Sequence, residues 1–340
     1  MKSICLLRLS AIGDVCHALA LVNVLKARWP DCTITWVLGK AEAQLMAGIE
    51  GVELVVFDKK AGLKGMRTVW RQLKDRRFDA LLHMQIALRA SLLSLGIKAR
   101  RRIGFDKSRA GEGQWLFTNE RIGLPKGQHV LDNFLEFARY LGIEDPKPDW
   151  TLPVPAEAVQ KAEQLLPQGK RTLVICHSAS KAERCWPAER YAAVADWAHD
   201  QGLKVLLCGG PAPAEKALAQ AIGDAASAPV RDLTGQTDLK SLWALLRRAT
   251  VVLAPDTGPA HMASSQGTPT VGLYAHSNPR RTGPYNHQKW VANRYDANIL
   301  AQTGKPWQQL PWGARAKGEG LMAGIGVDEV IAKLKCILAE

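Results

Sequence analysis

The sequence lacks several features that mark whole classes of protein. No apolar run approaches the ~18 uninterrupted residues of a membrane span. The amino terminus has no long apolar core followed by small residues, which a signal peptide requires. The seven cysteines form no CxxC pair, so neither a zinc site nor a disulfide framework is indicated. These absences predict a cytosolic protein whose cysteines are reduced and mostly buried.

Short motifs that mark common enzyme classes are also missing. The sequence contains no GxGxxG, GxxxxGK[ST], HExxH, GxSxG or DxD motif. Their absence argues against dinucleotide-dependent oxidoreduction, P-loop nucleotide hydrolysis, zinc and serine hydrolysis, and metal-dependent sugar transfer.

Positive charge is present in excess and is unevenly distributed. The 340 residues carry a formal net charge of +13. The segment 59–109 alone contains fifteen Lys and Arg and three acids, a net charge of +12. Such a segment attracts phosphates on a nucleic acid, a membrane surface or a substrate. The alternative is an ordinary solvated helix face.

Short apolar runs alternate with helical periodicity along the chain, which predicts parallel sheets covered by helices. Strands are expected at 4–9, 33–38, 54–57, 80–84, 172–177, 204–210, 251–255 and 270–274. Helices are expected at 14–28, 62–77, 88–95, 130–141, 186–201, 212–222, 239–248, 258–266 and 327–339. Segment 144–155 holds four prolines and predicts a linker. The pattern indicates two doubly wound α/β domains, 1–155 and 156–325, followed by a helical segment 326–340, with 307–326 unassigned.

The stretch "RLSAIGDVCHAL" (8–19) places one carboxylate, Asp14, at the turn between the first expected strand and helix. An acid at a helix start is ordinarily an N-cap or a partner of the helix dipole. The alternative is a reactive carboxylate at the carboxyl end of a strand, where open α/β sheets bind ligands.

The stretch "VVLAPDTGPAHMASSQGTPTVGLY" (251–274) runs from a strand into a short helix. Small residues at a helix start expose backbone N–H groups that can bind a diphosphate. Asp256 or Thr257 could equally be a plain N-cap, with Pro259 near the first helical position. His261 lies in the first turn, where a positive imidazole is disfavoured, so we expect it to be neutral or to face a ligand.

Two further loops follow expected strands of the second domain. In "SKAERCWPAER" (180–190), Lys181 and Arg184 can present cations to an anionic leaving group, or can be solvated while Trp186 packs in the core. In "CGGPAPAEKAL" (208–218), Gly209 permits close approach of a ligand, and Glu215 can accept hydrogen bonds from ribose hydroxyls or stabilise the helix dipole. Together these strand ends indicate a nucleotide-diphosphate site.

Five segments, in this order, resemble the bacterial ADP-heptose:lipopolysaccharide heptosyltransferases of glycosyltransferase family nine: "RLSAIGDVCHALAL", "ERCWPAERYAAVA", "LLCGGPAPAE", "APDTGPAHMASSQGTPTVGLY" and "NPRRTGPY". The resemblance implies a GT-B fold, with two Rossmann-like domains facing a cleft and a carboxy-terminal helix crossing back to the first domain. It also implies inverting transfer of L-glycero-D-manno-heptose from ADP-heptose to the inner core of lipopolysaccharide, with no metal or other cofactor.

The resemblance also assigns roles to individual residues. Asp14 matches the family's general base, and Arg184 stands where many members have lysine. The residues expected to bind the donor are Ser10, Gly13, Ser178, Lys181, Gly209, Glu215, Asp256, Thr257, Gly258, Pro259 and His261. The residues expected to bind the anionic acceptor are Lys59, Lys60, Lys64, Arg67, Gln85, Arg89, Lys107, Arg109 and His129. Since isolated aspartate has a pKa of about 3.9, a general base at Asp14 predicts burial in the cleft.

The resemblance extends to the acceptor and the location. The segments "LYAHSNPRRTGPYN" and "PWGARAKGE" look closest to members that add the first heptose to Kdo-lipid A. An enzyme of this kind acts at the cytoplasmic face of the inner membrane of a Gram-negative bacterium, as a peripheral protein on an anionic surface. The alternatives are transfer of a later core heptose or of another nucleotide-linked sugar such as a UDP-sugar. A basic nucleotide- or nucleic-acid-binding protein is a further alternative, although no RNP, KH or helix-turn-helix signature is present.

Overall fold

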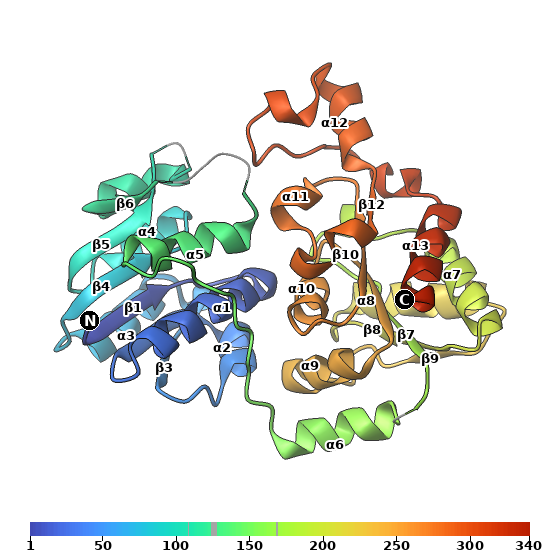
Figure 1. The fold of residues 1–340 in the computed structure, drawn as a ribbon, viewed down its shortest axis with the longest axis horizontal. Coiled ribbons are helices and arrows are strands. Elements are labelled where there is room, and N and C mark those ends of the chain that lie inside the picture. Colours follow the sequence, from blue (N-terminus) through green and yellow to red (C-terminus); the bar gives the residue numbers. More distant parts are fainter. Residues whose placement is uncertain (108, 124–127, 168) are drawn as a thin grey trace. The chain divides into compact units, whose positions relative to one another are not determined.

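The computed structural model describes residues 1–107, 109–123, 128–167 and 169–340. The chain divides into two compact units, Met1–Pro153 (unit 1) and Val154–Glu340 (unit 2) (Figure 1). The division falls within the proline-rich segment 144–155.

Unit 1 is a parallel sheet with helices on both faces (Figure 1). Its strands are β1 (Ser3–Leu7), β2 (Thr33–Gly39), β3 (Val52–Phe57), β4 (Phe78–His83), β5 (Ala99–Phe105) and β6 (Glu120–Ile122). Its helices are α1 (Ile12–Arg28), α2 (Lys40–Met46), α3 (Gly62–Leu73), α4 (Leu88–Ser94) and α5 (Val130–Tyr140), with the short 3₁₀ helices η1 (Lys59–Ala61) and η2 (Gly111–Phe117). The strand order β3-β2-β1-β4-β5-β6 places a topological switch point between β1 and β4, where ligands of such sheets bind.

The two faces of this sheet are covered by different helices. Met66 of α3 and Leu93 of α4 share one buried cluster with Cys5 and Leu7 of β1. α1 and α5 pack against each other. Because side chains alternate along a strand, Ile4 and Leu6 of β1, which are also buried, point to the opposite face. Burial of both faces explains why β1 is a continuous apolar run.

Unit 2 repeats this connectivity. Its strands are β7 (Thr172–Cys176), β8 (Lys204–Cys208), β9 (Val230–Asp232), β10 (Val251–Pro255), β11 (Thr270–Tyr274) and β12 (Val291–Asn293). Its helices are α6 (Ala156–Leu165), α7 (Ala188–Asp200), α8 (Pro213–Ala225), α9 (Leu239–Arg248), α10 (Gly258–Ser265), α11 (Pro279–Thr282), α12 (Tyr295–Thr303) and α13 (Val327–Ala339). The 3₁₀ helices are η3 (Ala182–Arg184), η4 (Tyr285–Trp290), η5 (Trp307–Gln309) and η6 (Leu321–Gly324). The order β12-β11-β10-β7-β8-β9 places its switch point between β7 and β10.

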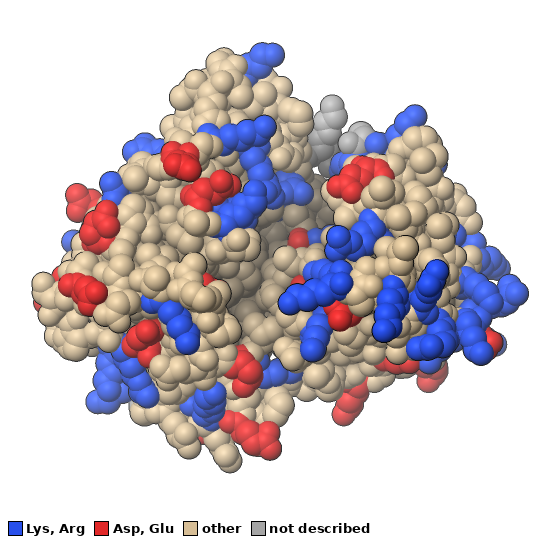
Figure 2. Space-filling view, turned by 180° about the vertical axis from the view of Figure 1, so that it is seen from behind, with Lys and Arg blue, Asp and Glu red and all other residues tan. Residues whose placement is uncertain are grey.

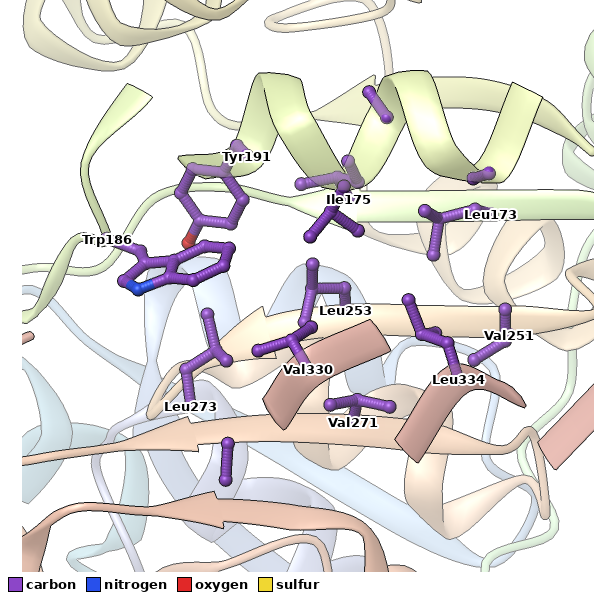
Figure 3. Packing of buried hydrophobic residues seen from close by; sticks show 14 of the residues in the cluster. Leu173, Ile175, Trp186, Tyr191, Val251, Leu253, Val271, Leu273, Val330 and Leu334 are labelled. Carbon is purple, nitrogen blue, oxygen red and sulfur yellow. The ribbon is translucent and has the colours of Figure 1, made fainter. Parts of the chain in front are cut away.

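The core of unit 2 includes the final helix. Figure 3 shows Val330 and Leu334 of α13 packed beside Leu253 and Val271 of the sheet. This helix, which was expected to cross back to the first domain, contributes its buried apolar face to the core of unit 2. Trp186 lies edge-to-face with Tyr191 at 5.2 Å in the same core, as its alternative interpretation predicted.

The described residues also bear on two expectations from composition. All seven cysteines are free, and five are buried, which confirms the prediction of mostly buried thiols. None of the helices that the described residues form is both long enough and apolar enough to cross a lipid bilayer.

Candidate functional site

Unit 1 contains a cavity of about 320 Å³ beside the carboxyl ends of β1 and β4. The loops that follow these strands and the start of α4 form much of its wall. The lining residues are Leu9, Ser10, Lys59, Gln85, Ala87, Arg89, Ala90 and Glu112. Four of the predicted site residues, from three separate segments of the sequence, therefore meet at one cavity: Ser10, Lys59, Gln85 and Arg89.

Asp14 lies in the first turn of α1, next to this region. Its Oδ2 forms an ion pair with Arg8 and accepts a hydrogen bond from the Ala11 N–H at 3.3 Å. The Asp14 side chain is 31% exposed. A buried setting is the expectation for a general base, and within unit 1 the carboxylate is instead partly exposed and held by a cation.

Arg8 is a site residue that the sequence patterns did not indicate. Its Nη1 donates to the Met84 carbonyl at 2.6 Å, and its guanidinium lies 5.2 Å from the centre of the Phe134 ring. These contacts hold the Arg8 guanidinium in place. Because Arg8 pairs with Asp14, they also orient the Asp14 carboxylate. Arg8 and the Ala11 N–H both contact Oδ2 of Asp14.

The cavity wall after β4 is fixed by a buried polar network. Gln114 donates from Nε2 to the carbonyls of His83 (2.7 Å) and Gln85 (3.2 Å), and the His83 ring contacts Ser91 Oγ at 3.2 Å. Burial lowers the pKa of His83 to about 3, so its imidazole is neutral near pH 7. The Gln85 side chain in turn accepts from the Leu9 N–H at 3.1 Å. The network joins β1, β4 and η2 around the cavity.

The remaining predicted acceptor residues do not line this cavity. Lys60, Lys64 and Arg67 are exposed on η1 and α3. Lys107 lies over the Trp115 ring, 4.7 Å from its centre. By contrast, Lys59, named above among the lining residues, has its Nζ 3.8 Å from the buried Glu42 carboxylate.

Two further predicted site residues, Arg109 and His129, contact other residues of unit 1. Arg109 pairs with Asp106 and donates to Asn133 Oδ1 at 3.0 Å, and burial lowers its pKa. His129 is buried and caps α5, accepting the Leu131 N–H at Nδ1 (3.0 Å). This capping contact uses Nδ1, and the binding role of His129 stays a prediction. Gly13 is buried within the first turn of α1.

The basic segment 59–109 is partly neutralised by acids that lie outside it. Arg76 pairs with Glu53, and Arg101 forms a two-pronged pair with Glu120. The Arg102 guanidinium instead donates hydrogen bonds to backbone carbonyls, including that of Ile97 at 2.7 Å. The charge that faces solvent is therefore smaller than the +12 counted along the sequence.

Unit 2 brings Arg184 and Asp256 together from the two sides of its switch point. Arg184 follows β7 and Asp256 follows β10, and Arg184 Nη1 lies 3.7 Å from Asp256 Oδ2. Both side chains are 14% exposed. Ser277, which follows β11 and which no sequence motif indicated, donates its hydroxyl to the same carboxylate oxygen.

The helix that follows Asp256 begins with predicted donor-site residues. Thr257 is the N-cap of α10, yet its side chain makes no capping hydrogen bond with any described residue. Gly258 and Pro259 form the first positions and are partly exposed, whereas His261 is buried. The backbone at the start of α10 can therefore receive an anion without displacing a side-chain cap.

A second part of this site lies at the ends of β7 and β8. Glu215, in the first turn of α8, accepts the Gly210 N–H at 2.6 Å through Oε2. A Cβ at residue 210 would lie 2.8 Å from Glu215 Oε1, so glycine lets this carboxylate approach the turn. A Cβ at residue 209 would lie 3.0 Å from the His177 ring. Gly209 and Gly210 therefore make room for the side chains of His177 and Glu215.

His177 is a further residue that the sequence patterns did not indicate. Its Nδ1 contacts Ser178 Oγ at 2.6 Å and its Nε2 contacts Thr234 Oγ1 at 3.1 Å. Burial lowers the pKa of His177 to about 4. Its position directly after β7 is the signal that would have identified it. The predicted donor residue Lys181 is exposed, and its Nζ lies 3.7 Å from the Glu183 carboxylate.

Comparisons with known proteins identify the family of this chain. The family model described as glycosyltransferase family 9 (heptosyltransferase) matches residues 66–306. A protein of Haemophilus influenzae called lipopolysaccharide core heptosyltransferase OpsX is 45% identical, over 98% of this chain and 96% of its own length.

Two solved structures share the fold along their whole length. The glycosyltransferase family 9 protein of Veillonella parvula has a TM-score of 0.80 and 24% identity, covering 99% of this chain and 97% of its own. The Escherichia coli ADP-heptose lps heptosyltransferase II has a TM-score of 0.77 and 20% identity, covering 100% and 99%. The predicted fold class, GT-B with two Rossmann-like units, is thus confirmed. The family match and the 45% identical relative each span most of the sequence, so this chain belongs to glycosyltransferase family 9, the heptosyltransferases.

Proposed function

We propose that this enzyme transfers L-glycero-D-manno-heptose from ADP-heptose to the Kdo region of the lipopolysaccharide inner core. The observation that carries the proposal is the Arg184–Asp256 pair at the start of α10, where β7 and β10 end. The names of two similar proteins support the same assignment: one is called a lipopolysaccharide core heptosyltransferase and the other an ADP-heptose heptosyltransferase.

Unit 2 supplies the donor half of the reaction in this proposal. The backbone N–H groups at the start of α10 and the Arg184 guanidinium bind the diphosphate. Glu215 Oε2 is occupied by the Gly210 N–H, which leaves Oε1 to accept from ribose hydroxyls. As the bond from the anomeric carbon to the diphosphate breaks, ADP leaves with the electron pair, and these fixed cationic and N–H groups stabilise the added charge. The proposed reaction therefore uses no metal.

Unit 1 supplies the acceptor half. The acceptor hydroxyl forms a bond to the anomeric carbon on the side opposite the leaving diphosphate, which inverts its configuration. Asp14 Oδ1 takes the hydroxyl proton while Arg8 holds Oδ2. Lys59 and Arg89 line the cavity of unit 1, and in this proposal they bind the carboxylates of Kdo. We assign the acceptor as Kdo-lipid A and the product as the first heptose of the core, at the cytoplasmic face of the inner membrane.

The test is an assay of the purified protein with EDTA present, using ADP-heptose and a panel of acceptors: Kdo-lipid A, its phospho-Kdo and Kdo₂ forms, and a heptose-bearing core. We expect transfer to a Kdo acceptor and ADP release in equal amounts. Transfer only to the heptose-bearing core would overturn the assignment of the first heptose. A thermal shift with ADP and none with UDP is expected, and stabilisation by UDP alone would contradict the donor.

A further inference from the structure

Helix α4 carries a row of exposed leucines on the side that faces away from the core. Leu88 and Leu92 of α4 and its C-cap residue Leu95 follow the spacing i, i+4, i+7 and are 45%, 38% and 61% exposed. Residues at this spacing lie on one face of a helix. The opposite face, with Ala90 and Leu93, is buried against the sheet and α3. The exposed leucines are therefore a second apolar stripe that the fold of unit 1 does not use.

Other exposed apolar side chains lie on elements that pack beside this helix. η2 packs against α4 and carries Leu116, and the loop before α4 carries Ile86. Trp70 of α3 donates to the Leu93 carbonyl at 2.8 Å, and Leu63 lies seven residues before it on the same face of α3.

We call this set the apolar patch. It consists of Leu63, Ile86, Leu88, Leu92, Leu95 and Leu116. It holds six of the nine large apolar side chains that are exposed among the described residues. A gathering of this kind on a globular protein marks an interaction surface.

Exposed cations lie on the elements that carry the apolar patch, on η1, or on the segment that follows α4. They are exposed and make no ion pair with a described residue, and they are Lys60, Lys64, Arg67, Arg71, Arg89, Lys98 and Arg100. Figure 2 shows Lys and Arg side chains gathered on the visible face of unit 1. Among nearby acids, Glu112 is occupied, since its carboxylate accepts the Leu88 N–H at 2.7 Å. Asp75 lies 3.8 Å from Lys74, and Asp58 caps η1.

We propose that the apolar patch and these exposed cations dock unit 1 on an anionic lipid bilayer. Exposed leucines on one helix face insert at the headgroup boundary, and flanking Lys and Arg bind anionic lipids. Charge argues against a second copy of this chain as the occupant, because self-association would bring the exposed cations of two copies together. A bilayer satisfies both the apolar and the cationic parts of the surface.

This surface also relates to the acceptor site, a point that rests on the proposed function. The start of α4 contributes Arg89 to the cavity, and the same helix, with its C-cap Leu95, contributes Leu88 and Leu92 to the apolar patch. Docking of α4 on the bilayer therefore holds the cavity at the depth of lipid headgroups. The sugar of a lipid-anchored acceptor would reach the cavity without leaving the membrane.

The test is sedimentation of the full chain with vesicles of phosphatidylcholine, with and without phosphatidylglycerol. The wild type is expected to sediment with the anionic vesicles, and less so at high salt. A Leu92→Ser/Leu95→Ser double variant is expected to bind at least about tenfold more weakly, because it removes two inserting side chains. The matched control is Leu300→Ser in α12 of unit 2, whose leucine is 48% exposed and lies outside the patch.

Unchanged vesicle binding by the double variant would overturn the proposal. So would a wild type that dimerises through this surface and a double variant that is monomeric by analytical ultracentrifugation. Circular dichroism melts confirm that each variant folds. In transfer assays the double variant should lose activity only on vesicle-embedded acceptor and keep it on a delipidated Kdo oligosaccharide. If neither acceptor is used by the wild type, the proposed function fails while the vesicle result stands.

Discussion

At the scale of single residues, the arrangement around Asp14 depends on contacts between distant segments. Its position at a strand end made Asp14 predictable from the sequence. Arg8 was not predictable, because its role comes from the Met84 carbonyl after β4 and the Phe134 ring in α5. An arginine inside an apolar run gives no sign of which partners the fold will bring to it.

Replacing Asp14 with asparagine tests the proposed proton acceptor. The amide keeps the size of the side chain and an oxygen for the Ala11 N–H, but it does not take up a proton. We expect kcat to fall by at least ~10²-fold while ADP binding, measured by calorimetry, stays unchanged. Asp75→Asn, an exposed acid of the same unit, is the control and should keep wild-type turnover. An Asp14→Asn variant with normal kcat would show that another group takes the proton.

Arg184 tests the stabilisation of the leaving diphosphate. Arg184→Ala removes the cation that lies 3.7 Å from Asp256 and leaves that poorly exposed carboxylate without its ion-pair partner. We expect kcat/KM for ADP-heptose to fall by ~10²-fold or more, with weaker ADP binding. Arg184→Lys keeps the charge and should recover part of the loss. Equal losses in the lysine and alanine variants would indicate that the planar guanidinium, and not its charge, is required.

At the scale of elements, the strands that are buried on both faces were the easiest to predict. β1, β4, β7 and β10 are buried on both faces and stand out as apolar runs. β5 was not predicted, because three consecutive arginines interrupt its apolar pattern. In the fold, Glu120 and backbone carbonyls bind two of these arginines. β9 and β12 are edge strands of three residues, too short for a periodic pattern.

The final helix, α13, shows that a periodic apolar pattern can predict the bounds of a helix without predicting its packing partner. Its bounds agree with the prediction, but its apolar face does not say which unit it covers. We expect Leu334→Ala to lower the free energy of unfolding by about 3 kcal/mol, because it opens a cavity in the core of unit 2. Urea denaturation measures this, and exposed Lys335→Ala in the same helix should change stability by less than about 0.5 kcal/mol. A neutral Leu334→Ala would place α13 outside that core.

At the scale of the whole molecule, two copies of one connectivity carry different chemistry at the same location. Candidate site residues lie at both switch points, where the rule for open α/β sheets expects ligands to bind. Unit 1 combines a cavity whose lining includes two cations with exposed leucines, whereas unit 2 combines glycine turns, a helix start and a partly buried ion pair. Connectivity and strand ends were therefore predictable from alternation along the chain. The side-chain networks that distinguish the two sites were not, because each joins loops that follow different strands.

Three buried histidines give the molecule a shared response to pH. Burial lowers the pKa of His83 to about 3 and that of His177 and His287 to about 4, from an ordinary value of 6.5. In the unfolded chain each takes up a proton near pH 6.5, whereas in the folded protein each stays neutral until about pH 4 or below. Unfolding therefore binds protons in this window, and stability that is complete above pH 6.5 is lost as the pH falls through it.

We expect the free energy of unfolding to fall by about 1.4 kcal/mol per pH unit for each of these histidines between pH 6 and 4.5. The carboxylates with lowered pKa, Asp79, Glu120 and Asp238, act at lower pH, because they bind protons in the unfolded chain only near pH 4. Urea denaturation over this range measures the slope. A His83→Gln variant, which keeps a polar group beside Ser91, should lose one histidine's share of that slope. His199→Gln, at the end of α7, is the matched control, and an equal change in its slope would contradict the assignment to buried rings.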